Sequence, residues 1–337
     1  MSDEASSQRA WWKRSQTAVA PPAADVPDIA TRAAYLRRLD LTIKKRLDGL
    51  LAGEFLGILP GPGTERSGGR IYGPGDDARR IDWSLTARSL APHIRTTDAD
   101  RELETWLVVD RSASLDFGTT VREKRELALC AVAAFGSLAQ RGANRVGMMV
   151  SGGPELVRFD PKGGRTSLFG MLSRLDRMPR STPSPGATAS LTDALNQLQR
   201  TQIRRGQIIV ISDFLESDDW SRSIRRLALH HQVVAVQVID PREFALPAMG
   251  ILGLIDPETG HTMHVQTNSA SLRERFAQAA QDRHSAIAHQ LQHAGAAHIV
   301  LSTDDDWLRE IVRFVSIRRS RGGGDVVATQ HHRRVAQ

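Results

Sequence analysis

The segment Trp106-Leu107-Val108-Val109-Asp110-Arg111-Ser112-Ala113-Ser114 decides the fold of this chain. Its first four residues, 106–109, are apolar, which is typical of a short strand buried on both faces of a sheet. A carboxylate follows the strand at once, and two hydroxyls come after it at alternate positions. The segment therefore predicts a buried strand that presents oxygen atoms at its carboxyl end.

Strand-like apolar runs alternate with helical patterns along the rest of the chain. Strands are expected at residues 106–109, 145–151, 156–159, 207–211, 233–239 and 298–301. Helices are expected at residues 121–141, 166–176, 190–202, 218–230, 270–293 and 306–318. Strands separated by helices of this length pair in parallel through right-handed crossovers. The pattern predicts a doubly wound α/β domain with a mainly parallel sheet, in which ligands bind outside the carboxyl ends of the strands.

Composition divides the 337 residues into five parts. Residues 1–29 are rich in Ala, Pro and Ser, which predicts a disordered tail. An amphipathic helix is expected at 30–52, and the Gly/Pro-rich, charged segment 53–104 predicts extended strands and turns. The α/β domain is expected over 105–320, followed by a flexible basic tail at 321–337.

The net charge of +7, from 45 Lys and Arg against 38 Asp and Glu, is concentrated in two segments. Residues 32–46 carry six bases and one acid (+5), and residues 317–337 carry five bases and one acid (+4). Together they give +9, so the remainder of the chain is at about −2. A near-neutral middle without interleaved aromatic residues does not predict specific nucleic-acid binding. Both basic segments could contact a membrane surface.

The expected helix at 30–52 has an apolar stripe formed by Leu36, Leu39, Ile43, Leu47 and Leu50. Such a stripe packs against the helix's own domain more often than against anything else. We expect that arrangement, with an anionic membrane as the alternative partner.

Cys130 is the single cysteine, so an internal disulfide and a multi-cysteine zinc site are both excluded. The first residues contain no apolar signal-peptide core, and no run of apolar residues is long enough to span a membrane. We expect a cytoplasmic protein, with the inner face of the membrane as the surface that the basic segments could reach.

Two of the expected strands end in oxygen-rich sequences. Asp110, Ser112 and Ser114 follow the first strand, and Asp213 follows the strand at 207–211. Carboxylate and hydroxyl oxygens are hard donors, which suit Mg²⁺ first and also Mn²⁺ or Ca²⁺. Because Mg²⁺ takes about six ligands and keeps several waters, two or three protein ligands would leave a position for an incoming carboxylate.

The Asp-x-Ser-x-Ser pattern at 110–114 resembles the metal-ion-dependent adhesion site of von Willebrand factor A domains. In that family a threonine from a loop before a middle helix completes the site, and an aspartate follows a middle strand. Asp213 matches this aspartate. Residues 186–191 resemble the family's Gly-Gly-Thr loop with a shift of one residue, so the resemblance implies Thr188 as the third ligand, with Ser190 as the alternative.

Residues 70–83, Arg-Ile-Tyr-Gly-Pro-Gly-Asp-Asp-Ala-Arg-Arg-Ile-Asp-Trp, with Ala87-Arg88 after them, resemble the signature of the bacterial domain-of-unknown-function 58 family. Members join this motif to a von Willebrand A-like domain and are typically encoded beside MoxR-type AAA+ ATPases. The resemblance extends over about residues 35–320 and implies such an ATPase as a partner. The signature residues in this chain are Arg70, Tyr72, Gly75, Asp76, Asp77, Arg79, Asp82, Trp83 and Arg88.

The signature segment also has a physical interpretation, because its acids and bases alternate around Tyr72 and Trp83. One interpretation is an internal network of charge-assisted hydrogen bonds that pins an irregular segment to the domain. The other is a partner-recognition surface, since Arg, Tyr and Trp are favoured as interface anchors.

These features predict a non-enzymatic, chaperone-like interaction protein that assembles or activates other proteins together with a MoxR-type ATPase. The client would supply an Asp or Glu to the bound cation. The chain has no Gly-x-x-x-x-Gly-Lys-Ser/Thr loop, so it is not itself a P-loop ATPase. Two alternatives stay open: a metal-dependent phosphatase or nuclease with Asp116 or His93 as its base, and a metal-free structural scaffold.

Overall fold

The computed structural model describes residues 29–50, 70–71, 86–87, 91–94, 104–119, 122–141, 144–181, 188–202, 204–216, 219–255 and 261–320. The predicted tails at 1–29 and 321–337 lie outside these ranges except for Ile29, which is the first residue of α2 (Ile29–Leu50). Arg70 belongs to β1 (Arg70–Ile71), which pairs antiparallel with β2 (His93–Ile94). The other signature residues lie outside the described ranges: Tyr72, Gly75, Asp76, Asp77, Arg79, Asp82, Trp83 and Arg88.

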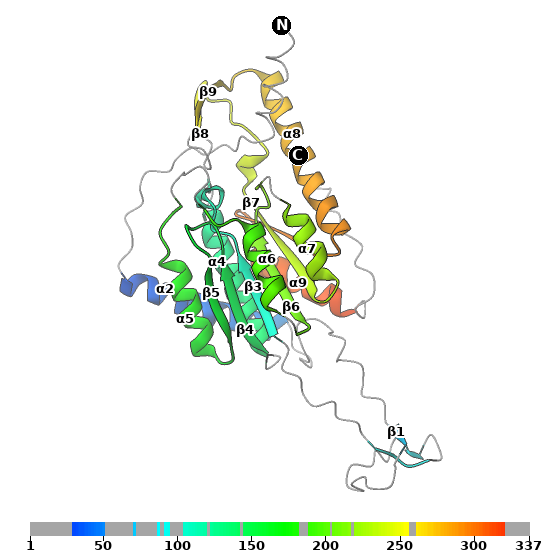
Figure 1. Ribbon diagram of the computed structural model, residues 1–337. Coiled ribbons are helices and arrows are strands. Elements are labelled where there is room, and N and C mark those ends of the chain that lie inside the picture. Colours follow the sequence, from blue (N-terminus) through cyan, green and yellow to red (C-terminus); the bar gives the residue numbers. More distant parts are fainter. Residues whose placement is uncertain are drawn as a thin grey trace.

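A six-stranded sheet with the order β10-β7-β6-β3-β4-β5 forms the centre of the molecule (Figure 1). Its strands are β3 (Glu104–Val109), β4 (Arg145–Val150), β5 (Val157–Lys162), β6 (Gly206–Ser212), β7 (Gln232–Ile239) and β10 (Ala297–Ser302). Every neighbouring pair is parallel except β4–β5. The predicted mainly parallel sheet is therefore confirmed.

Helices cover both faces of this sheet, which makes a three-layer α/β/α arrangement (Figure 1). One face packs against α2 (Ile29–Leu50), α4 (Lys124–Arg141), α5 (Arg165–Asp176) and α9 (Trp307–Ser320). The other face packs against α6 (Leu191–Thr201), α7 (Trp220–Ala228) and the C-terminal part of α8 (Ala270–His293).

Strand β3 shows why this sequence needs two covering layers. Leu107 and Val109 belong to the core beneath α4, whereas Trp106 and Val108 belong to the core beneath α6 and α7. All four side chains are at most 1% exposed. Because successive side chains of a strand point to opposite faces, a continuous apolar run requires cover on both sides.

A smaller core lies at one end of the domain, beside the N-terminal half of α8. The hairpin of β8 (Ile251–Ile255) and β9 (Thr262–Gln266) packs there, with Leu246, Leu254 and Val265 as its buried residues. Figure 1 shows this hairpin beside the end of α8 that projects beyond the sheet.

The apolar stripe of α2 is buried in the domain. Leu36, Leu39, Ile43 and Leu47 are at most 9% exposed and join the core shared with α4, α5 and α9. Arg46 makes a two-fold hydrogen-bonded ion pair with Asp306 at the start of α9, at 2.8 and 2.9 Å. The prediction that this helix packs on its own domain is confirmed.

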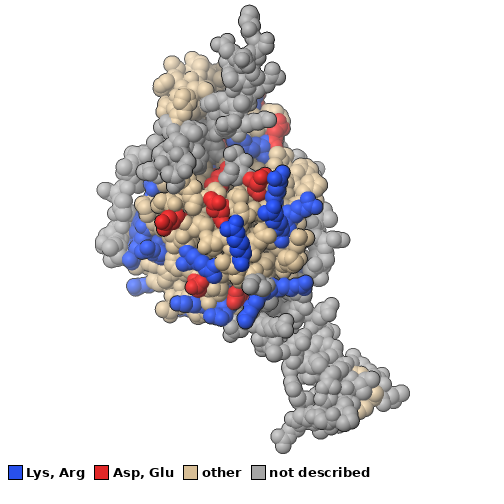
Figure 2. All heavy atoms as spheres, in the orientation of Figure 1, with Lys and Arg blue, Asp and Glu red and all other residues tan. Residues whose placement is uncertain are grey.

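Among the described residues, no helix has the length and apolar character needed to cross a membrane. On the face of the molecule drawn in Figure 2, acidic side chains lie among the basic ones.

A truncation in α2 tests how firmly this helix belongs to the core. Ile43 is fully buried, so Ile43→Ala should lower the free energy of unfolding by about 2–4 kcal/mol in urea denaturation. Leu41 on the same helix is 60% exposed, and Leu41→Ala should change stability by less than ~0.5 kcal/mol. Equal, small effects of the two substitutions would show that α2 is only loosely attached.

His298 on β10 makes stability depend on pH. Burial first, and the nearby His284 second, lower the pKa of His298 to about 4. Between the unfolded pKa of about 6.5 and this value, only the unfolded chain takes up the proton. The free energy of unfolding should therefore fall as pH drops from 6.5 towards 4, with a slope of up to ~1.4 kcal/mol per pH unit. His298→Gln should remove this component, whereas the exposed His293→Gln should retain it.

Candidate functional site

The strand order reverses between β3 and β6, and the candidate site lies at the carboxyl ends of these two neighbours. The chain runs from β3 to β4 on one side and later returns to β6 on the other side of β3. Asp110 follows β3 and Asp213 follows β6, and each is 1% exposed. The backbone NH of Asp110 donates to the carbonyl of Ile211 at 2.9 Å, which holds the two strand ends together. This is the position at which α/β sheets bind ligands.

The loop after β3 brings its predicted oxygen donors together. Ser112 and Ser114 are both buried, and their Oγ atoms lie 3.0 Å apart. The Asp110 carboxylate accepts from the NH of Ser112 at 2.8 Å and from Oγ of Ser212 at 2.6 Å. The short η2 helix (Ala113–Asp116) begins here and turns Ser114 back towards Ser112.

Burial perturbs the acid at the centre of this loop. Burial first, and the nearby charge of Asp213 second, raise the pKa of Asp110 to about 6. The hydrogen bonds from Ser212 and Ser112 oppose the shift because they stabilise the carboxylate. Strongly perturbed acids of this kind are typical of functional sites.

Lys124 lies fully buried between two acids of the site, and its role was not predicted from the sequence. Its Nζ donates to Asp213 Oδ2 at 2.8 Å and to Glu243 Oε1 at 2.5 Å. Burial disfavours the charged ammonium, but the two carboxylates outweigh burial and raise the pKa of Lys124. The site therefore holds a protein cation of its own.

Asp213 has protein partners on both carboxylate oxygens. Oδ2 binds Lys124, and Oδ1 accepts from the NH of Leu215 at 3.2 Å. The turn that makes this possible passes through Phe214, whose φ of +59° is rare for a side chain other than glycine. Asp213 is thus held in place by its own loop and by α4.

The two candidates for the third ligand differ in their surroundings. Thr188 is exposed on the loop before α6. Ser190 caps α6, since its Oγ accepts from the NH of Asp193 at 3.0 Å and donates to Asp193 Oδ2 at 2.9 Å. Ser190 is therefore already used by the helix cap, which leaves Thr188 as the freer hydroxyl.

Backbone contacts attach this loop to the site. Ala189 exchanges two hydrogen bonds with the end of β4, to Gly152 and Gly153, each at 2.8 Å. Gly152 in turn lies against the loop after β3: a Cβ there would fall 2.3 Å from the nitrogen of Ser112, and its φ is +87°. A glycine is required at this position, and it brings the loops around Ala189 and Ser112 next to each other.

Of the predicted metal ligands, the two serine hydroxyls are spaced as a small divalent cation requires, whereas Asp213 already has a cation as its partner. Ligands about 2.1 Å from Mg²⁺ in an octahedron lie about 3.0 Å from their neighbours, which is the separation of the Ser112 and Ser114 hydroxyls. Asp213 does not fit as a direct ligand while it holds Lys124. Among the described residues, no group of three or more His, Cys, Asp or Glu side chains could hold a metal ion.

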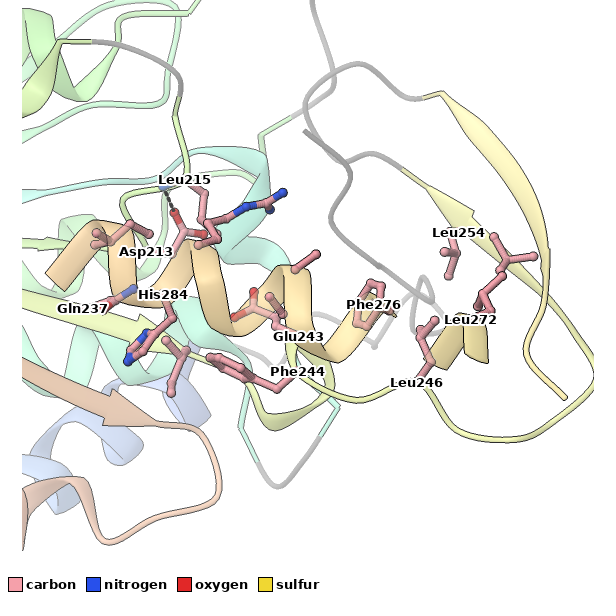
Figure 3. Close-up of a pocket in the computed structure, with 16 residues that line it drawn as sticks. Asp213, Leu215, Gln237, Glu243, Phe244, Leu246, Leu254, Leu272, Phe276 and His284 are labelled. Carbon is pink, nitrogen blue, oxygen red and sulfur yellow. Dashed lines mark hydrogen bonds between the residues drawn. The ribbon is translucent and has the colours of Figure 1, made fainter. Parts of the chain in front are cut away.

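A pocket opens beside Asp213 and encloses about 800 Å³, counting the solvent at its mouth. Asp213 and Glu243 lie at its sheet end, and Leu254 and Leu272 lie at its hairpin end (Figure 3). Arg283 also lines the pocket. Burial lowers the pKa of its guanidinium, and the nearby carboxylates of Glu243 and Asp213 offset only part of this shift. The pocket is thus apolar at one end and charged at the other.

Asp116 and His93, the two candidates for the base of a hydrolase, each have contacts of their own within the protein. Asp116 accepts from the NH of Ser181 at 2.9 Å and pairs with Arg125 at 3.1 Å, so both of its oxygens have partners. His93 belongs to β2, with its Nδ1 2.8 Å from the carbonyl oxygen of Ala91.

The comparisons with known sequences give a family without an assigned activity. The sequence profile described as "Protein of unknown function DUF58" matches residues 68–286. Uncharacterized protein Rv1480 of Mycobacterium tuberculosis is 46% identical over 287 residues, which cover 85% of this chain and 90% of the relative. An uncharacterized protein of Mycobacterium avium, MAV169, is 37% identical over 164 residues, covering 49% of this chain and 95% of the relative.

Solved structures resemble the chain more distantly. BatB from Bacteroides thetaiotaomicron aligns with 65% of this chain and 99% of its own, at 14% identity and a TM-score of 0.40. An aerotolerance-related membrane protein from Bacteroides fragilis aligns with 64% of this chain and 99% of its own, at 15% identity and a TM-score of 0.41. TM-scores this low carry no argument about fold or function.

Replacement of Lys124 tests the buried charge cluster. Lys124→Met leaves the buried Asp213 and the partly buried Glu243 without their cation, so we expect a loss of about 3–5 kcal/mol in the free energy of unfolding. Lys44 is a matched control, because its pair with Asp40 is 3.6 Å long and its side chain is 37% exposed. Lys44→Met should cost less than ~1 kcal/mol. A similar small loss in both variants would mean that the Lys124 pairs contribute no more than surface pairs.

Proposed function

The chain belongs to the DUF58 family, and from that premise we propose that it is a von Willebrand factor A-like interaction protein without catalytic activity. Its partner would bind through a divalent cation at the carboxyl ends of β3 and β6, with Mg²⁺ as the preferred candidate. The observation that carries the proposal is the convergence of the buried Ser112 and Ser114 hydroxyls beside Asp110 at the point where the strand order reverses.

Ser112, Ser114 and Asp110 would hold the cation, with Thr188 as the further hydroxyl and Ser190 as its alternative. When bound, the cation would supply a positive contact for an Asp or Glu of the partner. The protein's own part is positioning: Ser212 and the NH of Ser112 orient the Asp110 carboxylate, and Gly152 lets the neighbouring loop approach.

The resemblance of residues 70–88 to the family signature implies the class of partner. We propose a MoxR-type AAA+ ATPase and a client protein that presents an Asp or Glu, so that the chain acts as a chaperone-like adaptor in assembly or activation. Arg70 and the signature segment after it are the second candidate contact, as a binding surface or as an internal brace.

We place this activity in the cytoplasm, with the inner membrane face as a further surface. The apolar stripe of α2 is buried, so contact through 32–46 would rest on its basic side chains alone. Anionic lipid attracts such residues by about 1 kcal/mol each near the surface.

One observation favours a second function, a metal-dependent phosphatase or nuclease. The pKa of Asp110 at about 6 is suited to proton transfer near neutral pH. Against it, both oxygens of Asp110 accept hydrogen bonds from the protein, as do both oxygens of Asp213. Phosphatase or nuclease turnover that disappears in Asp110→Asn would establish this second function.

Partner capture tests the first proposal. The purified chain is immobilised, and binding of a purified MoxR-type AAA+ ATPase is measured with Mg²⁺ and with EDTA. Asp110→Asn should weaken Mg²⁺-dependent capture by about tenfold or more, the size expected for one charge-assisted contact. Asp219→Asn, an acid 69% exposed at its side chain on α7, serves as the control and should bind normally.

Two results would contradict the cation-dependent mode. One is capture that is equal in Mg²⁺ and EDTA, and the other is capture that is equal in Asp110→Asn and the parent. Either would favour the metal-free scaffold.

A further inference from the structure

The acidic half of the strand-end site already contains a cation. Lys124 Nζ lies 2.8 Å from Asp213 Oδ2 and 2.5 Å from Glu243 Oε1, and the lysine side chain is fully buried. These are the distances of strong charge-assisted hydrogen bonds. A metal ion that bound Oδ2 of Asp213 would have to displace this ammonium, and one that bound Oδ1 would share a carboxylate whose charge Lys124 already neutralises.

Hydrogen bonds to the backbone hold both the lysine and its two acidic partners in place. Its backbone NH donates to the carbonyl of Phe117 at 2.8 Å, which anchors the first turn of α4 over the site. Glu243 Oε2 accepts from the NH of Asp240 at 3.1 Å, so the second carboxylate is held by the segment after β7. Asp213 is held by the NH of Leu215. The ammonium therefore lies between two carboxylates whose side-chain rotation is restricted by these hydrogen bonds.

We propose that Lys124 is the resident cation of Asp213 and that it determines how the site binds divalent ions. By occupying Asp213, it limits a divalent ion to Asp110 as the one carboxylate of the site, together with the Ser112 and Ser114 hydroxyls. The site consequently takes Mg²⁺ or Mn²⁺ more weakly than a site with two free carboxylates.

This arrangement has a consequence for partner binding. Affinity for a divalent ion rises with the number of charged ligands, but two carboxylates also cancel the charge of the ion. With one carboxylate available, the bound ion keeps a net positive charge towards the open side of the site. Lys124 thus favours a partner carboxylate over water as the remaining ligand. This last step rests on the proposed function, whereas the occupation of Asp213 by Lys124 does not.

The test is a Mn²⁺ titration followed by electron paramagnetic resonance, which reports free Mn²⁺ without any activity. The informative variant is Lys124→Met combined with Glu243→Gln, because it removes the ammonium and one of its two acids together. Mn²⁺ affinity should rise at least tenfold over the parent. Adding Asp213→Asn to this variant should cancel the gain. The exposed pair of Arg222 and Asp219, 3.2 Å apart, provides the matched control: Arg222→Met with Asp219→Asn should leave the affinity unchanged.

Each outcome of the titration decides the inference. Equal affinity in the parent and the Lys124→Met, Glu243→Gln variant would overturn it, as would a gain that survives Asp213→Asn or an absence of Mn²⁺ binding in both proteins. Mn²⁺ binding in the variant but not in the parent would support the inference while contradicting the cation-dependent part of the proposed function.

A measurement on the unaltered protein covers the case in which the variant does not fold. In a crystal of the full chain soaked in Mn²⁺, the anomalous peak should lie beside Ser112 and Ser114, with Lys124 still bound to Asp213. A Mn²⁺ ion ligated directly by Asp213, with Lys124 displaced, would overturn the inference.

Discussion

The ammonium of Lys124 between Asp213 and Glu243 is the interaction on which the end of this sheet depends. It joins the first turn of α4 to the end of β6 and to the segment after β7. The buried Asp213 carboxylate would be costly without a cation, and Glu243, whose side chain is 13% exposed, would lose its ion pair as well. Removal of the ammonium alone would leave both acids uncompensated, so the three groups depend on one another.

The same cluster separates the strand-end site into two halves with different properties. On one side, Asp110 and the Ser112 and Ser114 hydroxyls converge with a separation that suits a small cation. On the other side, Asp213 is neutralised by the protein and forms one end of an apolar pocket. Asp213 lines this pocket, whereas Asp110, Ser112 and Ser114 are not among its lining residues.

The sequence predicted the sheet and the two strand-end aspartates, because apolar runs such as 106–109 and the residues after them are local signals. It did not predict Lys124 or Glu243 as part of the site. Lys124 lies in the charged run 122–126 at the start of α4, where the sequence does not distinguish it from its charged neighbours. Glu243 comes after a third strand end, within η3 (Pro241–Glu243), and only the tertiary structure brings it to Lys124. Contacts between distant segments leave no periodic pattern in a sequence, which is why pairing could not be predicted.

If one cation-assisted site binds the proposed partner, binding of Mg²⁺ and binding of the partner are thermodynamically linked. Calorimetry on the full chain would give the Mg²⁺ affinity with and without the purified MoxR-type ATPase, and the ATPase affinity with and without Mg²⁺. Each ligand should tighten the binding of the other by the same factor, and Asp110→Asn should remove the coupling. Mg²⁺ and partner affinities that are independent of each other would contradict a cation-assisted site.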